Sequence, residues 1–206
     1  MLTAFSTRVY LKSLLPQRRQ WQRLNQQLLK ECLDLAMLDR AGVAWSRDNY
    51  GPGFTSYASA NRMHENSPTF ASLETLIRPH VLAYAKALYF DLPRTALRMS
   101  TCWVNLMPKG AAHGMHNHPL SVISGTYYVQ TPTGSSPLQF EDPRYGLFMA
   151  RPAIKARAPQ EAQALISATP SVGQVILFES WLRHQVPSNP SAKLRISISF
   201  NYEWLG

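Results

Sequence analysis

The chain has 206 residues and a formal net charge of +9, and 45% of its residues are hydrophobic against 16% charged. This length fits one domain with a full buried core. The sequence contains no run of 18 or more apolar residues, so we expect no membrane-spanning segment. The basic residues are scattered apart from Arg18, Arg19 and Arg23, and no nucleic-acid-binding motif accompanies them. The charge therefore favours a solvated basic surface over a nucleic-acid-binding face.

The cysteines and the N-terminal residues indicate the cellular compartment in which the protein is expected. The N-terminal residues lack the charged-then-apolar layout of a secretory signal. Cys32 and Cys102 lie far apart in the sequence and in different predicted elements, so we expect both to be reduced, buried thiols. Both features predict a cytoplasmic protein. The sequence carries no signal for an oligomeric state.

The chain begins with a short strand and a long helix. Residues 1–15 alternate as a strand and turn would, and Pro16 stands where a helix would begin. Apolar residues then recur at helical spacing and predict one amphipathic helix over roughly 17–39. Gly42 is expected to end this helix.

A loop and a second helix follow. Residues 43–66 contain a Gly- and Pro-rich stretch typical of a loop, which either covers a binding site or only connects two elements. Ser67 is a predicted cap, and Pro68 occupies the first position of the next helix. Pro79 should kink or divide that helix.

From about residue 96 the pattern changes from helical spacing to alternation. Short candidate strands follow one another, separated by turn residues, which predicts antiparallel strands in a sandwich or barrel with helices packed outside. We expect one domain over 1–206, with a mostly helical flank at 1–95 and the β core at 96–206. The candidate strands are 97–105, 122–130, 137–141, 163–168, 174–179, 183–187 and 193–203.

Histidines form the most distinctive local pattern. Three of the six lie within 113–118, and side chains two apart on a strand share a face, so a strand here would present His116 and His118 to one point. Imidazole is a ligand for iron, zinc, copper and nickel. A single histidine such as His184 is more often structural, but with this pair it completes a set of three. His113 is expected to be a loop residue or a neighbour of the ligands.

The last predicted strand has one polar face, which carries Arg195, Ser197, Ser199 and Asn201. The pattern alone favours a solvated outer face. The alternative is an inward face on which the guanidinium of Arg195 and the hydroxyl of Ser197 bind a carboxylate.

The order of these motifs resembles that of the iron(II)- and 2-oxoglutarate-dependent oxygenases. It looks like a bacterial and phage group that shares His-x-His-Pro (here 116–119), Ser-Gly-x-Tyr-Tyr-Val (124–129), a later histidine (His184) and Arg-Ile-Ser-Ile-Ser-Phe-Asn (195–201). The resemblance covers the β half closely and the N-terminal half weakly. It implies a mainly β fold with flanking helices, the double-stranded β-helix, which is a cupin-like jelly roll. It also implies Fe(II) and 2-oxoglutarate as cofactors, with hydroxylation of a substrate and release of succinate and CO2.

The resemblance also implies roles for single residues. His116 and His184 match metal ligands, Arg195 matches the residue that binds 2-oxoglutarate, and Ser197 matches its Arg-x-Ser partner. His118 fits the narrower group but departs from the wider superfamily, in which the first ligand pair is usually His-x-Asp or His-x-Glu. We expect His118 to be the third ligand, which leaves the metal and its ligands at +2 until the dianionic cosubstrate binds.

Other residues are secondary candidates. Asp142 is the runner-up carboxylate ligand, with Glu141 behind it, although the pattern at Asp142 favours a turn. Asn105 and Tyr128 could hydrogen-bond the cosubstrate, or they could be a sheet-face amide and a core aromatic. Basic residues within 143–162 favour an anionic small molecule or peptide as substrate.

Two other functions remain open. One is a three-histidine, cupin-type metalloenzyme that does not use 2-oxoglutarate, against which Arg195 and Ser197 argue. The other is a non-catalytic jelly-roll protein that binds a metal through the same histidines.

Overall fold

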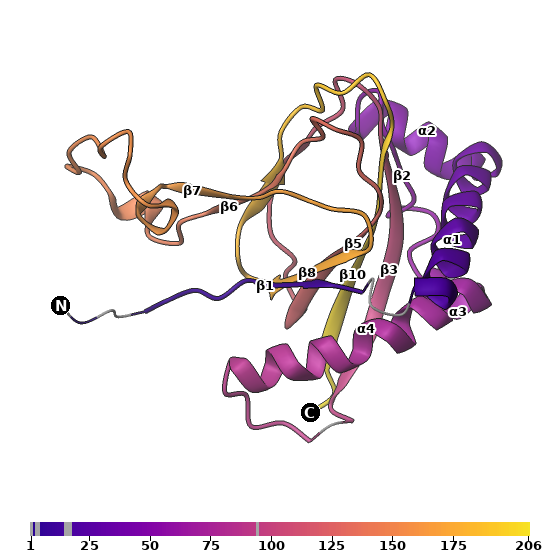
Figure 1. Cartoon of the computed structure of the whole chain (residues 1–206), viewed down its shortest axis with the longest axis horizontal. Helices are drawn as coiled ribbons and strands as arrows, with labels where there is room; N and C mark the ends of the chain where they lie inside the picture. The colour runs from indigo at the N-terminus through magenta and orange to yellow at the C-terminus, as the bar shows by residue number, and fades with distance from the viewer. Residues whose placement is uncertain (1, 3–4, 15–17, 94) are drawn as a thin grey trace.

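The strands form two antiparallel sheets that lie opposite one another (Figure 1). The computed structural model describes residues 2, 5–14, 18–93 and 95–206. Within these residues the larger sheet has six strands in the order β1-β8-β5-β10-β3-β2, and the smaller has four in the order β4-β9-β6-β7. The strands are β1 (Tyr10–Ser13), β2 (Phe54–Thr55), β3 (Leu97–Met107), β4 (His113–His116), β5 (Ile123–Gln130), β6 (Leu138–Glu141), β7 (Leu165–Ala168), β8 (Gln174–Glu179), β9 (His184–Val186) and β10 (Arg195–Trp204).

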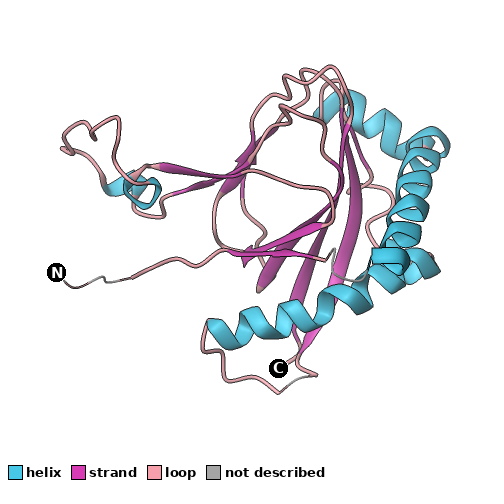
Figure 2. Cartoon of the chain, viewed as in Figure 1, coloured by secondary structure: helices cyan, strands magenta, loops and turns pink. Residues whose placement is uncertain are grey.

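The helices precede the β core in the sequence and pack outside the larger sheet (Figure 2). Among those described, no helix combines the length and apolar character needed to cross a lipid bilayer. A long connecting segment between β6 and β7 contains two short 3-10 turns. The helices are α1 (Arg18–Leu38), α2 (Arg40–Asn49), α3 (Met63–Asn66) and α4 (Pro68–Ala87), and the 3-10 turns are η1 (Tyr145–Leu147) and η2 (Gln160–Ala162).

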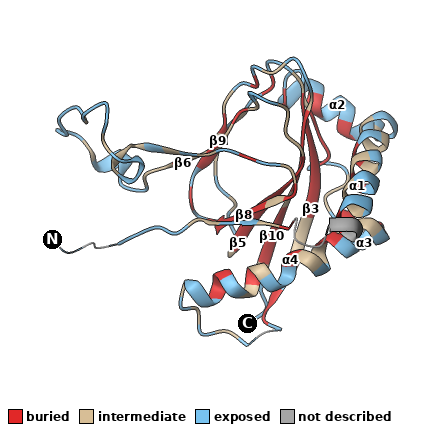
Figure 3. Ribbon diagram, viewed as in Figure 1, coloured by how far each residue is buried: buried red, intermediate tan, exposed pale blue. Residues whose placement is uncertain are grey.

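Two apolar clusters explain why the larger sheet is buried on both faces (Figure 3). In the first, Leu28 of α1 and Ile77 of α4 pack with Phe200 of β10. In the second, Phe140 of the smaller sheet packs with Phe178 of the larger one. Helices therefore cover one face of the larger sheet and the smaller sheet covers the other.

This double coverage decides the orientation of β10. Its polar face points into the space between the sheets, where Arg195, Ser197 and Asn201 are 1%, 2% and 5% exposed. The solvated outer face that the pattern alone favoured is therefore wrong. An alternating strand has two faces, and only the packing of the helices on the apolar one shows that the polar one lies inside.

The first predicted helix is confirmed as α1, while the expected start at Pro16 lies outside the described residues. Gly42 does not end the helical region, because a second helix, α2, contains it. Asp39 caps α2, and its side chain accepts a hydrogen bond from the Gly42 amide at 2.9 Å. A Cβ at Gly42 would clash with Asp39 Oδ2, so the glycine leaves room for the cap.

The second predicted helix is confirmed as α4, with Ser67 as its cap. The Ser67 hydroxyl accepts hydrogen bonds from the amides of Thr69 at 3.1 Å and Phe70 at 3.4 Å. Pro79 does not divide α4, which is continuous from Pro68 to Ala87. The buried side chains of Ile77 and Val81 lie on either side of Pro79 and hold both halves against the same core.

The predicted strands 97–105, 122–130, 137–141, 163–168, 174–179, 183–187 and 193–203 are confirmed as β3 and β5–β10. The region expected to be a loop, 43–66, instead holds most of α2, the two-residue strand β2 and α3. Strand β2 pairs with β3 through Phe54 opposite Leu106 and Thr55 opposite Asn105. Two residues carry too little alternation for a strand to be recognised from sequence.

Candidate active site

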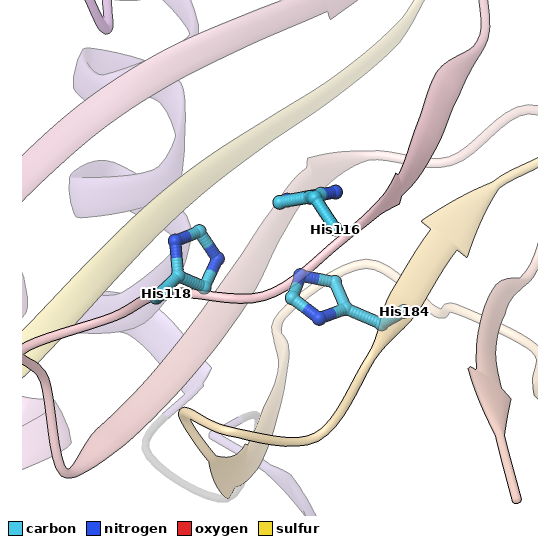
Figure 4. Close-up of side chains that lie close together, drawn as sticks. All are labelled: His116, His118 and His184. Atoms are coloured by element: carbon cyan, nitrogen blue, oxygen red, sulfur yellow. The ribbon is translucent and has the colours of Figure 1, made fainter. Parts of the chain in front are cut away.

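Three imidazoles converge between the two sheets (Figure 4). His116, His118 and His184 each offer a nitrogen, and these atoms lie within 4.8 Å of one another. The ring centroid of His116 lies 4.3 Å from that of His184 and 5.1 Å from that of His118. The structure thus brings together the three histidines that the sequence singled out as metal ligands.

Strand pairing and one backbone hydrogen bond produce this convergence. His116 ends β4 and lies opposite His184, the first residue of β9. His118 lies beyond the end of β4, so the shared face of one strand does not bring it to His116. Its backbone amide donates to the carbonyl of Ser180 at 2.9 Å, which places His118 beside the turn that leads into β9.

Two of these imidazoles have a defined tautomer. Nδ1 of His116 lies 2.7 Å from the carbonyl oxygen of Gly114, and Nδ1 of His184 lies 2.9 Å from that of Leu182. A carbonyl only accepts hydrogen bonds, so each Nδ1 carries the proton. Nε2 of both rings then keeps its lone pair, the form in which imidazole binds a metal.

Burial keeps these histidines neutral. Desolvation, helped by neighbouring imidazoles, lowers the pKa of His118 to about 3 and that of His184 to about 4. Burial also lowers the pKa of His116, against a smaller opposite effect from its hydrogen bond to the Gly114 carbonyl. No carboxylate among the described residues counteracts these shifts by raising the pKa of any of the three.

His113 is a neighbour of the cluster, as the sequence suggested. Its ring stacks on that of His116, with centroids 4.3 Å apart and an angle of 17° between the planes. Its other contact is the edge of the Tyr50 ring at 5.2 Å. Burial, then the nearby His116, His184 and Arg195, lowers the pKa of His113 to about 3.

Arg195 lies in the same cavity and is an unpaired buried cation. Its Nη1 contacts Met107 Sδ at 3.2 Å and Ser197 Oγ at 3.3 Å, and its Nε has no hydrogen-bond partner. Its guanidinium carbon lies 5.1 Å from the centre of the Tyr128 ring. Among the described residues no carboxylate forms an ion pair with Arg195. A buried charge without a partner is costly, which indicates that an anion from solution completes this site.

Two tyrosine hydroxyls in this cavity are also unpaired. The hydroxyls of Tyr50 and Tyr128 are buried and have no hydrogen-bond partner. Burial raises the pKa of Tyr50 to about 12, and the nearby Arg195 acts in the opposite direction with a smaller effect. Tyr128, a cosubstrate candidate from the sequence, therefore has a hydroxyl free to donate. Tyr50 was not predicted, because it lies in the region expected to be a loop and no local pattern distinguishes it.

Asn105 lines the cavity but its amide is already engaged. Its Oδ1 accepts a hydrogen bond from the hydroxyl of Thr55 at 2.8 Å, and its Nδ2 donates to Ser199 at 3.1 Å. The amide therefore joins β2, β3 and β10 across the floor of the cavity.

The runner-up carboxylates lie apart from the histidines. Asp142 forms an ion pair with Arg144 at 2.8 Å and accepts a hydrogen bond from the Arg144 amide at 2.9 Å, as in a turn. Glu141 pairs with Arg183 at 3.1 Å. Neither carboxylate is among the residues that line the cavity.

Aromatic side chains connect the cluster to the surface. The ring of Trp103 contacts His118 at 5.7 Å between centroids, and Tyr57 packs edge-on against Trp103 at 5.1 Å. Tyr57 is 46% exposed, whereas Trp103 is buried. Trp103 shares a face of β3 with Asn105, so its inward position follows from strand alternation.

These residues fit a metal ion and an anionic chelator. Three neutral imidazoles suit a divalent transition metal. The unpaired guanidinium of Arg195 and the free hydroxyls of Tyr50 and Tyr128 suit a carboxylate bound nearby. The cavity thus has donors for both groups of an iron and 2-oxoglutarate site.

Comparison with known proteins agrees with this chemistry. Residues 101–201 match the family described as "Putative 2OG-Fe(II) oxygenase". A search of the curated proteins gave no match.

Three solved structures show a similar fold. The structure of a Pseudomonas putida prolyl-4-hydroxylase is similar with a TM-score of 0.59 and 15% identity, over 98% of this chain and 95% of that one. HygX from Streptomyces hygroscopicus, solved with nickel, 2-oxoglutarate and hygromycin B, has a TM-score of 0.63 and 12% identity over 97% and 84%. The epimerase SnoN, solved with Fe3+, alpha ketoglutarate and nogalamycin RO, has a TM-score of 0.64 and 13% identity over 96% and 79%.

At these identities the likeness establishes the fold, and it confirms the double-stranded β-helix expected from the sequence. The family match over 101–201 spans β3 to β10 and includes the three histidines, Arg195 and Ser197. Over residues 101–201 this chain is therefore similar to the family of oxygenases that use iron(II) and 2-oxoglutarate.

Proposed function

We propose that the protein hydroxylates a small molecule, with iron held by His116, His118 and His184 and 2-oxoglutarate held by Arg195 and Ser197. The observation that carries this proposal is the buried, unpaired Arg195 in the same cavity as three neutral imidazoles. A metal site alone would not need a buried cation beside it. A chelating dianion with a second carboxylate does.

Bound together, Fe(II) and 2-oxoglutarate supply oxidation by O2, in which the oxo acid becomes succinate and CO2 and an oxygen atom enters a substrate C–H bond. The residues of the chain position the reactants and shield them. Arg195 and Ser197 orient the cosubstrate, and the hydroxyl of Tyr128 is free to donate to it. Apolar side chains on the cavity wall, Leu138, Phe178 and Val186, limit the access of water.

Three histidines in place of two histidines and a carboxylate also fit a metalloenzyme that does not use 2-oxoglutarate. An anaerobic titration of Fe(II) and then 2-oxoglutarate separates the two. We expect a weak visible metal-to-ligand charge-transfer band when both are present, because the oxo acid would chelate the iron. Metal binding without this band would instead support the three-histidine enzyme or a non-catalytic metal-binding protein.

We also propose that the chain acts as one domain over 1–206 and works in the cytoplasm. The packing of α1 and α4 against the larger sheet supports the first statement. Two free cysteines, Cys32 and Cys102, are both buried, and this supports a reducing compartment.

A further inference from the structure

The cavity around the histidines contains no acidic residue among those described. Its lining includes four histidines and one arginine, and the remaining lining residues are neutral. Glu141 and Asp142, the two carboxylates that the sequence offered as alternative metal ligands, form ion pairs with Arg183 and Arg144. Arg195 therefore has no internal counter-charge.

This composition changes the charge balance of the loaded site. A divalent metal with three neutral imidazole ligands carries +2, and Arg195 adds +1. A 2-oxoglutarate dianion brings the total to +1. With a carboxylate in place of His118 the same count would reach zero. Because Arg195 and His184 are buried and His116 and His118 are partly buried, solvent screens the remaining positive charge less than it would at the surface, and this charge acts on whatever binds next.

We infer that the substrate of this site is an organic anion, whose negative group lies close to the metal and supplies the missing charge. This inference rests on the proposed function. It makes His118 a specificity-determining residue. A neutral imidazole in place of a carboxylate leaves the loaded site with one more positive charge, which the negative group of the substrate would neutralise.

Aromatic rings between the surface and the histidines favour an organic anion that has an apolar or aromatic body. Tyr57 is half exposed and contacts Trp103, which in turn contacts His118. The faces and edges of these rings offer an apolar wall that ends at the cationic centre. A small inorganic anion would make no use of this wall.

The test compares two probes of equal shape, acetate and acetamide. The protein is loaded with Co(II) and saturated with 2-oxoglutarate, and line broadening of the probe's methyl signal in proton NMR spectra reports binding near the paramagnetic metal. Protein loaded with Zn(II) is the diamagnetic control. We expect acetate to bind at least about tenfold more tightly than acetamide, the factor that corresponds to about 1.4 kcal/mol. This readout does not require turnover.

His118→Asp is the matched variant, because it restores the carboxylate and removes the extra positive charge. With Co(II) and 2-oxoglutarate still bound, this variant should show similar broadening of acetate and acetamide. Equal binding of the two probes by the unchanged protein would overturn the inference, as would an acetate preference that survives in His118→Asp.

Failure of the proposed function gives a different result. Protein that does not bind Co(II) and 2-oxoglutarate together overturns the proposed function and this inference with it. Protein that binds both but does not distinguish the probes overturns only the inference. The acetate measurement is repeated at rising 2-oxoglutarate concentration. If the broadening of acetate falls, acetate is competing with 2-oxoglutarate at Arg195, and this result would also overturn the inference.

Discussion

Three side chains in the cavity carry buried polar atoms that the described residues leave without a partner. Among the described residues, the buried Arg195 has no counter-ion, and the buried hydroxyls of Tyr50 and Tyr128 have no hydrogen-bond partner. Buried polar groups in folded proteins nearly always have partners, so each exception calls for an explanation. A bound dicarboxylate explains all three together.

Arg195→Ala should weaken the binding of 2-oxoglutarate to the Ni(II)-loaded protein by at least about 30-fold, because truncating one partner of a buried charged pair costs about 2 kcal/mol or more. Isothermal titration calorimetry measures this loss. Arg195→Lys keeps the positive charge but loses the forked pair of donors. Its affinity for 2-oxoglutarate should lie between that of the unchanged protein and that of Arg195→Ala. Unchanged affinity in Arg195→Ala would show that the cosubstrate carboxylate binds elsewhere.

Tyr50→Phe should leave the free energy of unfolding of the metal-free protein unchanged or raise it by up to about 1 kcal/mol, since it removes a buried hydroxyl that has no partner. Tyr127→Phe is the matched control, because the Tyr127 hydroxyl accepts from Trp21 at 2.8 Å and donates to Asn25 at 2.9 Å. The control should lose about 1–3 kcal/mol. Urea unfolding measures both, and equal losses would contradict the assignment of Tyr50 as unpaired.

At the scale of elements, helix caps decide where each helix begins, which hydrophobic periodicity leaves open. Asp39 begins a second helix one residue after α1 ends, and Ser67 begins α4. The Ser67 hydroxyl also donates to Glu31 of α1 at 2.6 Å, so one side chain both caps a helix and ties two helices together.

Ser67→Ala should therefore reduce the free energy of unfolding by about 1–2 kcal/mol, the usual cost of losing a helix N-cap. Ser72→Ala is the control, because Ser72 is exposed and its hydroxyl bonds only to the carbonyl of Pro68 within α4. That variant should change stability by less than about 0.5 kcal/mol. Chemical denaturation of the two variants side by side checks the difference, and similar values would show that Ser67 does not stabilise the helix end.

At the scale of the whole molecule, the proposed ligands come from both sheets. His116 and His184 belong to the smaller sheet, whereas Arg195 and Tyr128 belong to the larger one. Metal and cosubstrate would therefore join the two layers, and their binding energy would add to the stability of the complete fold.

Co(II) with 2-oxoglutarate, each at about 100 times its dissociation constant, should raise the melting temperature by roughly 10–20 °C. Each ligand at this excess adds up to about 2.7 kcal/mol, and about 1 kcal/mol shifts a protein of this size by 2–4 °C. Differential scanning fluorimetry measures the shift. EDTA should reverse it, and His184→Ala should not show it. A melting temperature that does not respond to either ligand would argue against a site that spans the sheets.

The sequence by itself determined the order of the elements and the identity of the reactive side chains. Helical spacing with start signals identified α1 and α4, and alternation bounded by turn residues identified seven strands. The order of His116, His118, His184 and Arg195 along the chain, together with a family resemblance, indicates an iron and 2-oxoglutarate site.

Only the tertiary structure decided which faces of the elements meet. Alternation along β10 is the same whether Arg195 points to solvent or inward, and the helices packed on the opposite face settle it. Tyr50 joins the cavity from the end of α2, no acidic residue among those described lines the cavity, and Glu141 and Asp142 form ion pairs outside it. These properties depend on contacts between residues distant in the sequence, so no local pattern contains them.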